Sequence, residues 1–463
     1  MQTAVTGYLF LAILALSLVA FYVGRSTANR FVAAHGAEVH SRPLYHGAFA
    51  AVWVGLPALI LVVLWLLSQD GVIDRLILAS LPSSLTEGAS TSQLSLYLSE
   101  IKNVASGRIF SEPSPEIRAA AERYQRWHAI AGWAMVVVAL SVSTIALYLA
   151  RVRMAPKFRA RQNFERALDI IMITSAVVAI LVTIGIIVSL TYEALQFFML
   201  VPPQEFFFGL NWEPQIAIRE DQVAGTGAFG AVPVFTGTLL IAAIALIVAV
   251  PIGLLSALYL VEFASERFRG IVKPILEILA GVPTVVYGFF AILTVAPAIR
   301  EAGSLIGLSI SPNSALAAGG VMGIMILPFI SSLSDDALRA VPQSMRDGSF
   351  ALGATRAETI TRVLLPAALP GIVGGVLLAA SRAIGETMIV VMAAGLTATL
   401  TANPLDGVTT VTVQIVTLLI GDTSFDNPKT LSAFALGLVL FVSTLCLNVL
   451  ALRIVRRYRE KYE

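Results

Sequence analysis

Charged residues are scarce in this sequence. Charged side chains make up 13% of the 463 residues and hydrophobic ones 57%, against about 25% and roughly 45–50% in ordinary soluble proteins. A water-soluble fold of this size needs more charge to cover its surface, so most apolar residues must face lipid or pack between lipid-facing helices. We therefore expect a polytopic membrane protein.

Several other absences exclude whole classes of function. The only cysteine is Cys446, so no intramolecular disulfide can form. The four histidines lack the spacing of metal ligands. Gly is never followed by Lys, so the chain has no phosphate-binding P-loop and should not hydrolyse ATP itself. No catalytic triad or carboxylate pair stands out, and 31 basic residues nearly balance 29 acidic ones, which gives no argument for nucleic acid. We predict a transport component rather than an enzyme, with no metal or cofactor of its own.

Nine apolar runs are long enough to span a bilayer core of about 30 Å. They lie at about 4–23, 47–67, 129–150, 168–190, 235–260, 275–297, 315–334, 371–395 and 432–452. Alternating segments of about ten residues, which a membrane barrel would need, are missing, so we predict an all-α protein. The basic segment 151–166 divides it into an N-terminal extension, 1–166, with three spans, and a core, 167–463, with six.

Lys and Arg in the connections predict the orientation. Segment 151–166 and the tail after 452 are basic and should be cytoplasmic. The N-terminus and the loop at about 68–128 then lie outside, and the C-terminus inside. The first residues carry no positive charge, so we expect the first span to be a retained anchor rather than a cleaved signal peptide. Within the outside loop, Ser114-Pro115-Glu116 predicts the start of a helix that runs into the third span.

The cytoplasmic connection 335–370 holds the most informative soluble pattern. Its mixed charges and apolar spacing predict two short amphipathic helices, separated near Gly353 and ended near Pro366. It resembles the EAA loop of ABC-importer permeases, whose pattern is Glu-Ala-Ala, three residues, Gly, nine residues, Ile-x-Leu-Pro. The matching positions here are Asp347, Gly348, Ser349, Gly353, Val363, Leu365 and Pro366, and the triplet departs at all three of its residues. The resemblance implies that a separate ATPase docks on this loop.

A charged motif lies inside the span 371–395. An arginine at mid-bilayer costs at least about 2.5 kcal/mol, so Arg382 needs compensation. Glu386 is four residues later, so we expect the two side chains to share a helix face and to pair. A neighbouring strip of small residues would let another helix approach closely: Gly371, Gly375, Ala379 and Ala383. Either this ion pair only fixes packing, or the face lines a translocation path where Arg382 attracts an anion and Glu386 holds the guanidinium.

The run Arg382 to Thr387, Arg-Ala-Ile-Gly-Glu-Thr, following an EAA-like loop resembles the permeases of the phosphate ABC importer. Met388 and segment 407–413 resemble the PstC type, and segments 237–239, 250–262 and 279–288 also match, so the likeness covers about 220–460. It implies a six-helix type I permease core that carries inorganic phosphate across a bacterial inner membrane. The implied partners are a PstA-like second permease, a PstB-like ATPase dimer that uses ATP and Mg, and a PstS-like periplasmic phosphate-binding protein. The first 160 residues match only loosely and receive no role beyond topology.

Some assignments stay open from the residues alone. Pro251 and Pro283 predict irregular backbone, which is tolerated in a membrane only where it lines a cavity or is covered by protein. Glu277, Pro283 and Thr284 therefore belong either to the pathway or to packing. A position of Glu277 at the cytoplasmic interface near Lys273 fits the sequence equally well.

Rival functions also remain at this stage. A permease for sulfate or molybdate would keep the EAA loop and differ around Arg382. A secondary transporter should show inverted repeats, which the sequence lacks. A sensor or scaffold would leave Arg382 unexplained.

Overall fold

The computed structural model describes residues 2–35, 39–82, 91–108, 113–215, 227–420 and 427–459. Within these ranges nine helices are long and apolar enough to cross a membrane. They correspond to the nine predicted runs and confirm the all-α membrane fold. The chain forms two compact units, an N-terminal unit (Met1–Leu181) and a C-terminal unit (Val182–Glu463). The units meet inside the long helix α6 (Ala160–Leu200), and the division at 166 stays a prediction.

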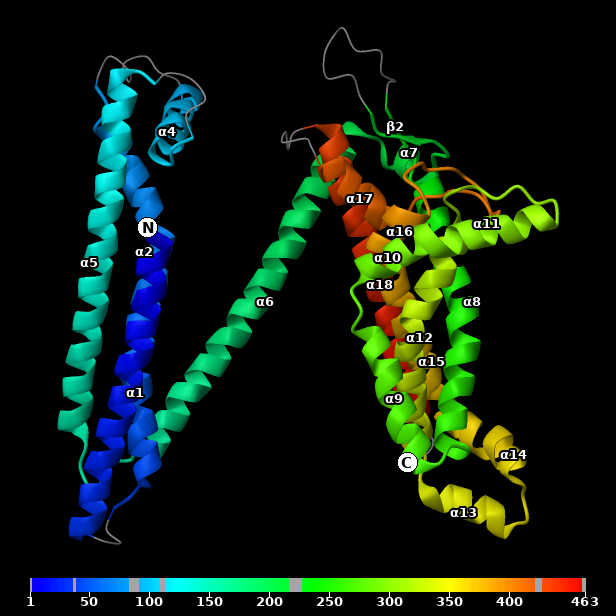
Figure 1. Cartoon of the computed structure of the whole chain (residues 1–463), viewed down its shortest axis with the longest axis horizontal. Helices are drawn as coiled ribbons and strands as arrows, with labels where there is room; N and C mark the ends of the chain where they lie inside the picture. The colour runs from blue at the N-terminus through cyan, green and yellow to red at the C-terminus, as the bar shows by residue number, and fades with distance from the viewer. Residues whose placement is uncertain are drawn as a thin grey trace. The chain divides into compact units, whose positions relative to one another are not determined.

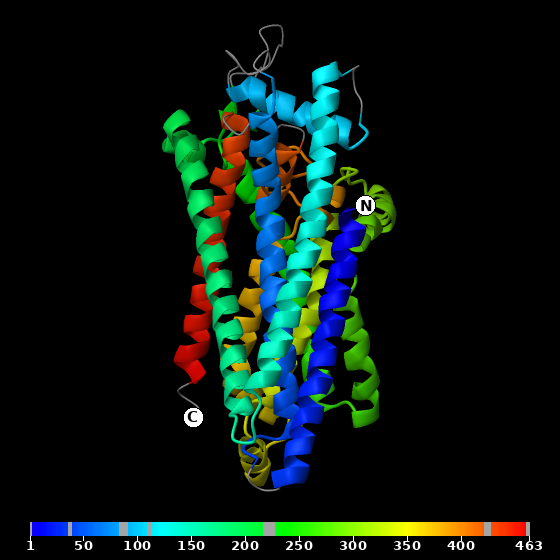
Figure 2. The ribbon, with the colours of Figure 1, turned by 90° about the vertical axis from the view of Figure 1, so that its left-hand side faces the viewer.

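The N-terminal unit is built on three long helices, α1 (Gln2–His35), α2 (Pro43–Ala79) and α5 (Pro115–Arg153). They run side by side (Figures 1 and 2). Glycines allow α1 and α2 to approach closely, because a Cβ on Gly24 would lie 2.7 Å from the carbonyl oxygen of His46.

The loop expected at 68–128 is largely helical in its described part. α2 continues to Ala79, and α4 (Thr91–Ala105) packs beside α5, while residues 83–90 and 109–112 lie outside the described ranges. The helix predicted to start at Ser114-Pro115-Glu116 is confirmed as α5. The Ser114 hydroxyl accepts a hydrogen bond from the backbone N–H of Ile117 and so caps its first turn.

Three helices form the centre of the C-terminal unit: α8 (Val232–Glu262), α12 (Ala315–Arg339) and α15 (Leu365–Ile384). α18 (Pro428–Arg459) packs against α15. α7 (Pro203–Phe208) and a two-residue antiparallel pair, β1 (Trp212–Glu213) with β2 (Ala228–Phe229), lie before α8. Small residues again allow close packing, since a Cβ on Gly319 would lie 2.7 Å from Cβ of Ile244 on α8.

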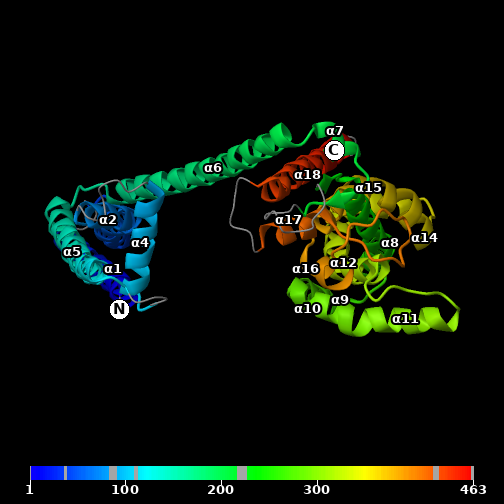
Figure 3. The same ribbon diagram turned by 90° about the horizontal axis from the view of Figure 1, so that it is seen from above.

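The span predicted at 275–297 is wrong in its extent, because two helices share it. α9 (Glu266–Ala280) ends before Pro283, and α10 (Thr284–Phe290) begins after it. Proline has no N–H for the helix and disfavours helical backbone in the residue before it. A π-helical turn, η2 (Ala291–Val295), then leads into α11 (Ala296–Leu305), which crosses the direction of the bundle and extends away from it (Figures 1 and 3).

In the 335–370 connection, the prediction of a first helix that ends near Gly353 is confirmed. The prediction that a second helix ends near Pro366 is wrong. α13 (Gln343–Ala351) is followed by Gly353 at φ +84°, a left-handed conformation that glycine adopts at low cost. The second helix begins as α14 (Arg356–Thr359), and helical backbone continues past Pro366. A π-helical turn, η3 (Ile360–Leu364), precedes the proline, and the chain continues directly into α15.

Candidate functional site

The helix that carries Arg382 is broken just beyond it. α15 ends at Ile384, and the short α16 (Met388–Ala393) starts four residues later, so the single helix predicted over 371–395 is wrong. Glu386 explains the break. Its carboxylate accepts hydrogen bonds from the backbone N–H groups of Met388, at 3.0 Å, and Ile389, at 3.5 Å. This side chain satisfies the start of α16 instead of pairing along α15.

The ion pair predicted between Arg382 and Glu386 is therefore wrong. It required a continuous helix, and none of the ion pairs among the described residues includes Arg382. The Arg382 side chain is exposed on the surface of the C-terminal unit, whereas Glu386 and Thr387 are half-buried. Arg382 thus presents a cation that no acidic side chain within the described ranges neutralises.

Packing of the small-residue strip fixes the depth of Arg382. A Cβ on Gly371 would lie 2.7 Å from Cβ of Ala337, and one on Gly375 would lie 3.0 Å from Cβ of Leu333. The predicted close approach at these glycines is confirmed, with α12 as the neighbour running antiparallel. Continuing the register places Arg382 level with Ile326, near the middle of α12.

Three segments singled out in the sequence meet around this break. On α8, Gly237 lies against the carbonyl of Thr409, and the Thr238 hydroxyl accepts a 3.0 Å hydrogen bond from the backbone N–H of Val411. On α10, a Cβ at Gly288 would lie 3.2 Å from the carbonyl oxygen of Met388. The break is therefore held in place by segments 237–239, 279–288 and 407–413.

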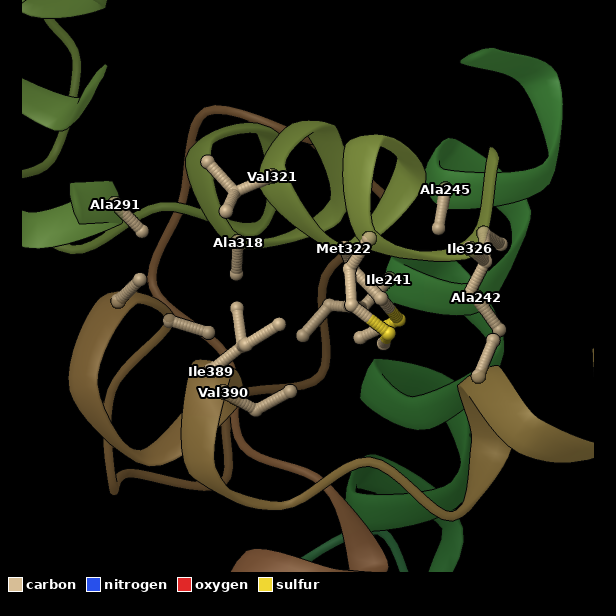
Figure 4. Close-up of a cluster of buried hydrophobic side chains, with 14 of the residues drawn as sticks. Ile241, Ala242, Ala245, Ala291, Ala318, Val321, Met322, Ile326, Ile389 and Val390 are labelled. Atoms are coloured by element: carbon tan, nitrogen blue, oxygen red, sulfur yellow. The ribbon is translucent and has the colours of Figure 1, made fainter. Parts of the chain in front are cut away.

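The start of α17 (Val411–Leu419) closes the site from the other side. The Thr412 hydroxyl donates a 2.8 Å hydrogen bond to the backbone carbonyl of Glu386. Figure 4 shows the apolar side of the same site, where Ile389 and Val390 of α16 lie beside Ala318 and Val321 of α12 in a fully buried cluster. The break therefore packs against an apolar cluster on one side and is hydrogen-bonded to the start of α17 on the other.

The structure does not decide whether Glu277, Pro283 and Thr284 belong to the pathway or to packing. Glu277 is exposed on α9, Pro283 separates α9 from α10, and Thr284 is half-buried at the start of α10. Lys273 is engaged elsewhere, because its ammonium lies 2.9 Å from Oδ2 of Asp335.

Two ion-pair sites at the end of the unit that carries α13, one around the buried Asp335 and one half-buried, were missed by sequence reasoning. The Asp335 side chain, 4% exposed, accepts from Arg269 at 2.8 Å and from Lys273, and these bonds fasten α9 to α12. The second joins Arg346 to Glu262, with 2.7 Å between Nη1 and Oε1. Asp335 was placed in a connection, whereas α12 in fact runs on to Arg339. An acid just after the apolar run 315–334 and two bases just before the preceding run, 275–297, were the available signal.

The residues of the EAA-like loop are mostly at the surface. Asp347 and Gly348 are exposed on α13, and the Ser349 hydroxyl lies 2.9 Å from that of Thr359, which ties α13 to α14. Leu365 is half-buried and Pro366 exposed. Phe350 and Leu352 are 44% and 91% exposed, so the tip of the loop presents apolar side chains outward.

Both units match families of transport proteins. A family model described as a phosphate ATP-binding cassette transporter matches residues 10–182, and one for the inner membrane component of binding-protein-dependent transport systems matches 249–460. A probable ABC transporter permease of Bacillus subtilis, YqgH, is 34% identical over 65% of this chain and 94% of its own length. The phosphate transport permease PstC 1 of Mycobacterium tuberculosis is 35% identical over 54% of this chain and 81% of its own length. The chain belongs to the PstC family.

Membership in the PstC family makes the chain the permease component of a phosphate ABC importer. It is a multi-pass membrane protein that does not hydrolyse ATP itself, and ABC permeases work with an ATPase and a binding protein. The phosphate-transporter model covers nearly the whole N-terminal unit. Sequence reasoning gave that unit no role beyond topology, since it carries no motif that a single sequence reveals.

Proposed function

We propose that phosphate crosses the membrane along the face of α15 that bears Arg382. The observation that supports this most is that Arg382, level with the middle of α12 and beside a helix break, has no ion pair among the described residues. Such a charge is costly in lipid and is stable where it meets water, a partner subunit or an anion. Broken helices held by neighbouring protein are a recurrent way to build substrate sites inside membranes.

One arginine suits transport better than a cluster. Phosphate must bind strongly enough to enter and weakly enough to leave. In this proposal Arg382 makes the transient contact, Glu386 shapes the break by capping α16, and Thr387 offers a hydroxyl beside it. Glu386 does not neutralise Arg382, so the guanidinium stays free for the anion.

The EAA-like loop is the proposed docking site of a PstB-like ATPase dimer, which binds ATP and Mg. The apolar tip at Phe350 and Leu352 supports this, because exposed large apolar side chains outside the bilayer favour a protein partner. Closure of the ATPase dimer would push α13 and α14 and bias the bundle between inward-facing and outward-facing states.

The positions of the remaining partners depend on how the chain is oriented in a bacterial inner membrane. The end with α13 and the C-terminus is cytoplasmic, and the N-terminus of the chain is periplasmic. A PstS-like protein would deliver phosphate at the opposite end of the C-terminal unit, where a cavity of about 560 Å³ lies between Trp212, Gln414 and Lys429. A PstA-like permease would complete the pathway opposite α15.

Aqueous access to the Arg382 face tests the pathway proposal. Leu378 lies one turn before Arg382 and is 41% exposed. In the assembled importer, with Cys446→Ser as background, we expect Leu378→Cys to react with a hydrophilic thiol reagent. Ile180→Cys, exposed at mid-helix on α6, is the matched lipid-facing control and should stay unlabelled. A Leu378→Cys protein that never reacts, with or without ATP, would count against a pathway on this face.

Substitution of Gly353 tests the docking proposal. Gly353 ends α13 in a left-handed conformation, and nothing lies within 4 Å of an added Cβ, so the cost of a side chain comes from the backbone. That cost is about 1–2 kcal/mol for an ordinary residue and less for asparagine. We expect the amount of ATPase that co-purifies with the tagged permease to fall in the order Gly353, Gly353→Asn, Gly353→Val. Equal recovery with all three would contradict docking through this turn.

A further inference from the structure

One charged side chain of α13 bonds to the ends of two membrane helices. Arg346, 14% exposed, lies 2.7 Å from Glu262, the last residue of α8, which is 11% exposed. The same guanidinium donates a 3.0 Å hydrogen bond to the carbonyl of Leu338 near the end of α12. One arginine thus contacts the ends of two membrane helices.

We infer that the Arg346–Glu262 pair transmits the movement of α13 to α8, which makes Arg346 a positioning residue for coupling ATP hydrolysis to transport. The inference rests on the proposed role of the EAA-like loop in docking the ATPase. It adds a route by which that docking reaches the phosphate pathway.

The other side-chain contacts of α13 are few and would transmit its movement to α8 less directly. No residue of α13 is buried, and only Met345 among its apolar side chains packs against the neighbouring core. The hydroxyl contact from Ser349 reaches α14, which belongs to the same loop. The ion pair between Arg346 and Glu262 is therefore the specific attachment of α13 to α8.

α8 leads from this ion pair to the site around Arg382. Glu262 ends the helix at the α13 end, and Thr238, near its other end, accepts the hydrogen bond from Val411 that helps hold the break. Pro251 lies between them, close to the level of Arg382, because Gly253 on α8 packs against Ile330 on α12. A displacement of Glu262 thus acts on a helix that touches the support of α16.

The contacts of Arg346 are not a fully satisfied network. Arg346 Nε is buried and finds no acceptor among the described residues. Buried donors without partners are rare and call for an explanation. A contact that rearranges between two states of the importer supplies one, because the free donor can take an acceptor in the other state.

The Asp335 site provides a comparison within the same end of the unit. It binds α9 to α12 through Arg269 and Lys273 and has no bond to α13. A loss of coupling caused by substitutions at Glu262 or Arg346 can therefore be distinguished from a general destabilisation of this end of the C-terminal unit.

The test uses the complete importer in proteoliposomes and measures phosphate moved per ATP hydrolysed. For Glu262→Gln and Arg346→Gln we expect ATPase binding and hydrolysis to persist while phosphate per ATP falls at least about fivefold, the lower range of coupling between sites. The double exchange Glu262→Arg with Arg346→Glu should recover part of the loss. Arg267→Gln, an exposed arginine on α9 without an ion pair among the described residues, is the control and should be unchanged.

The outcomes separate the inference from the docking proposal. If the ATPase fails to co-purify with the unaltered permease, docking through the loop is wrong. If it co-purifies and both single variants keep normal phosphate per ATP, the inference is wrong. Where single variants do not assemble, the double exchange decides: restored coupling supports the inference, and an assembled but uncoupled importer overturns it.

Discussion

Arg382→Gln should reduce phosphate uptake about 10- to 100-fold while the importer still assembles. The substitution keeps a hydrogen-bonding side chain of similar length and removes the charge. A hydrogen bond to a charged group contributes about 1.5–3 kcal/mol in water-exposed proteins, and more where solvent is excluded. Each 1.36 kcal/mol is a factor of ten in rate. Uptake of radiolabelled phosphate by cells that depend on this chain is the measurement.

Two controls define that result. Arg382→Lys keeps the charge but loses the planar, two-pronged donor geometry, so its uptake should be intermediate. Co-purification of the ATPase should be the same for all three proteins, because Arg382 forms no ion pair with the part of the chain that the structure describes. Normal uptake with Arg382→Gln would remove Arg382 from the pathway.

Asp335→Asn should strongly destabilise the permease. The carboxylate is 4% exposed and faces Arg269, which is 14% exposed, together with Lys273. Removing one partner of a buried ion pair leaves the other charge uncompensated, at a cost of about 3–5 kcal/mol. We expect a lower yield of folded protein and a lower midpoint of thermal unfolding in detergent.

The neighbouring residue is a matched control for that loss. Asp336 is exposed on the same helix and takes part in no ion pair among the described residues. Asp336→Asn removes the same charge and should leave the unfolding midpoint nearly unchanged. Equal midpoints for the two variants would show that the Asp335 site does not hold α9 to α12.

The elements that the sequence predicts well are those set by local physics. Length and apolarity locate the membrane spans, Ser114 and Pro115 mark the start of α5, and Gly353 marks the end of α13. The small residues at Gly371 and Gly375 predict close packing because only backbone and Cβ size matter there. Each of these features can be recognised from residues within a few turns of one another, although the helix that packs on the glycines, α12, is not.

The errors arise where a local competitor or a distant partner decides. Arg382 and Glu386 have the spacing of a helical pair, but the Glu386 carboxylate binds nearer backbone N–H groups and the helix ends first. Pro366 has the appearance of a helix end, and a π-helical turn carries the chain past it. The partners of Asp335 and Glu262 are 62 to 84 residues away, beyond what spacing on one helix reveals.

Transport of phosphate by this chain is tested most directly by labelled-phosphate uptake, competed with sulfate and molybdate, in cells that lack the chain and regain it from a plasmid. The chain should restore uptake, and an excess of either competing anion should leave that uptake unchanged. Restored uptake that sulfate or molybdate suppresses as well as unlabelled phosphate does would contradict a phosphate-specific pathway at Arg382.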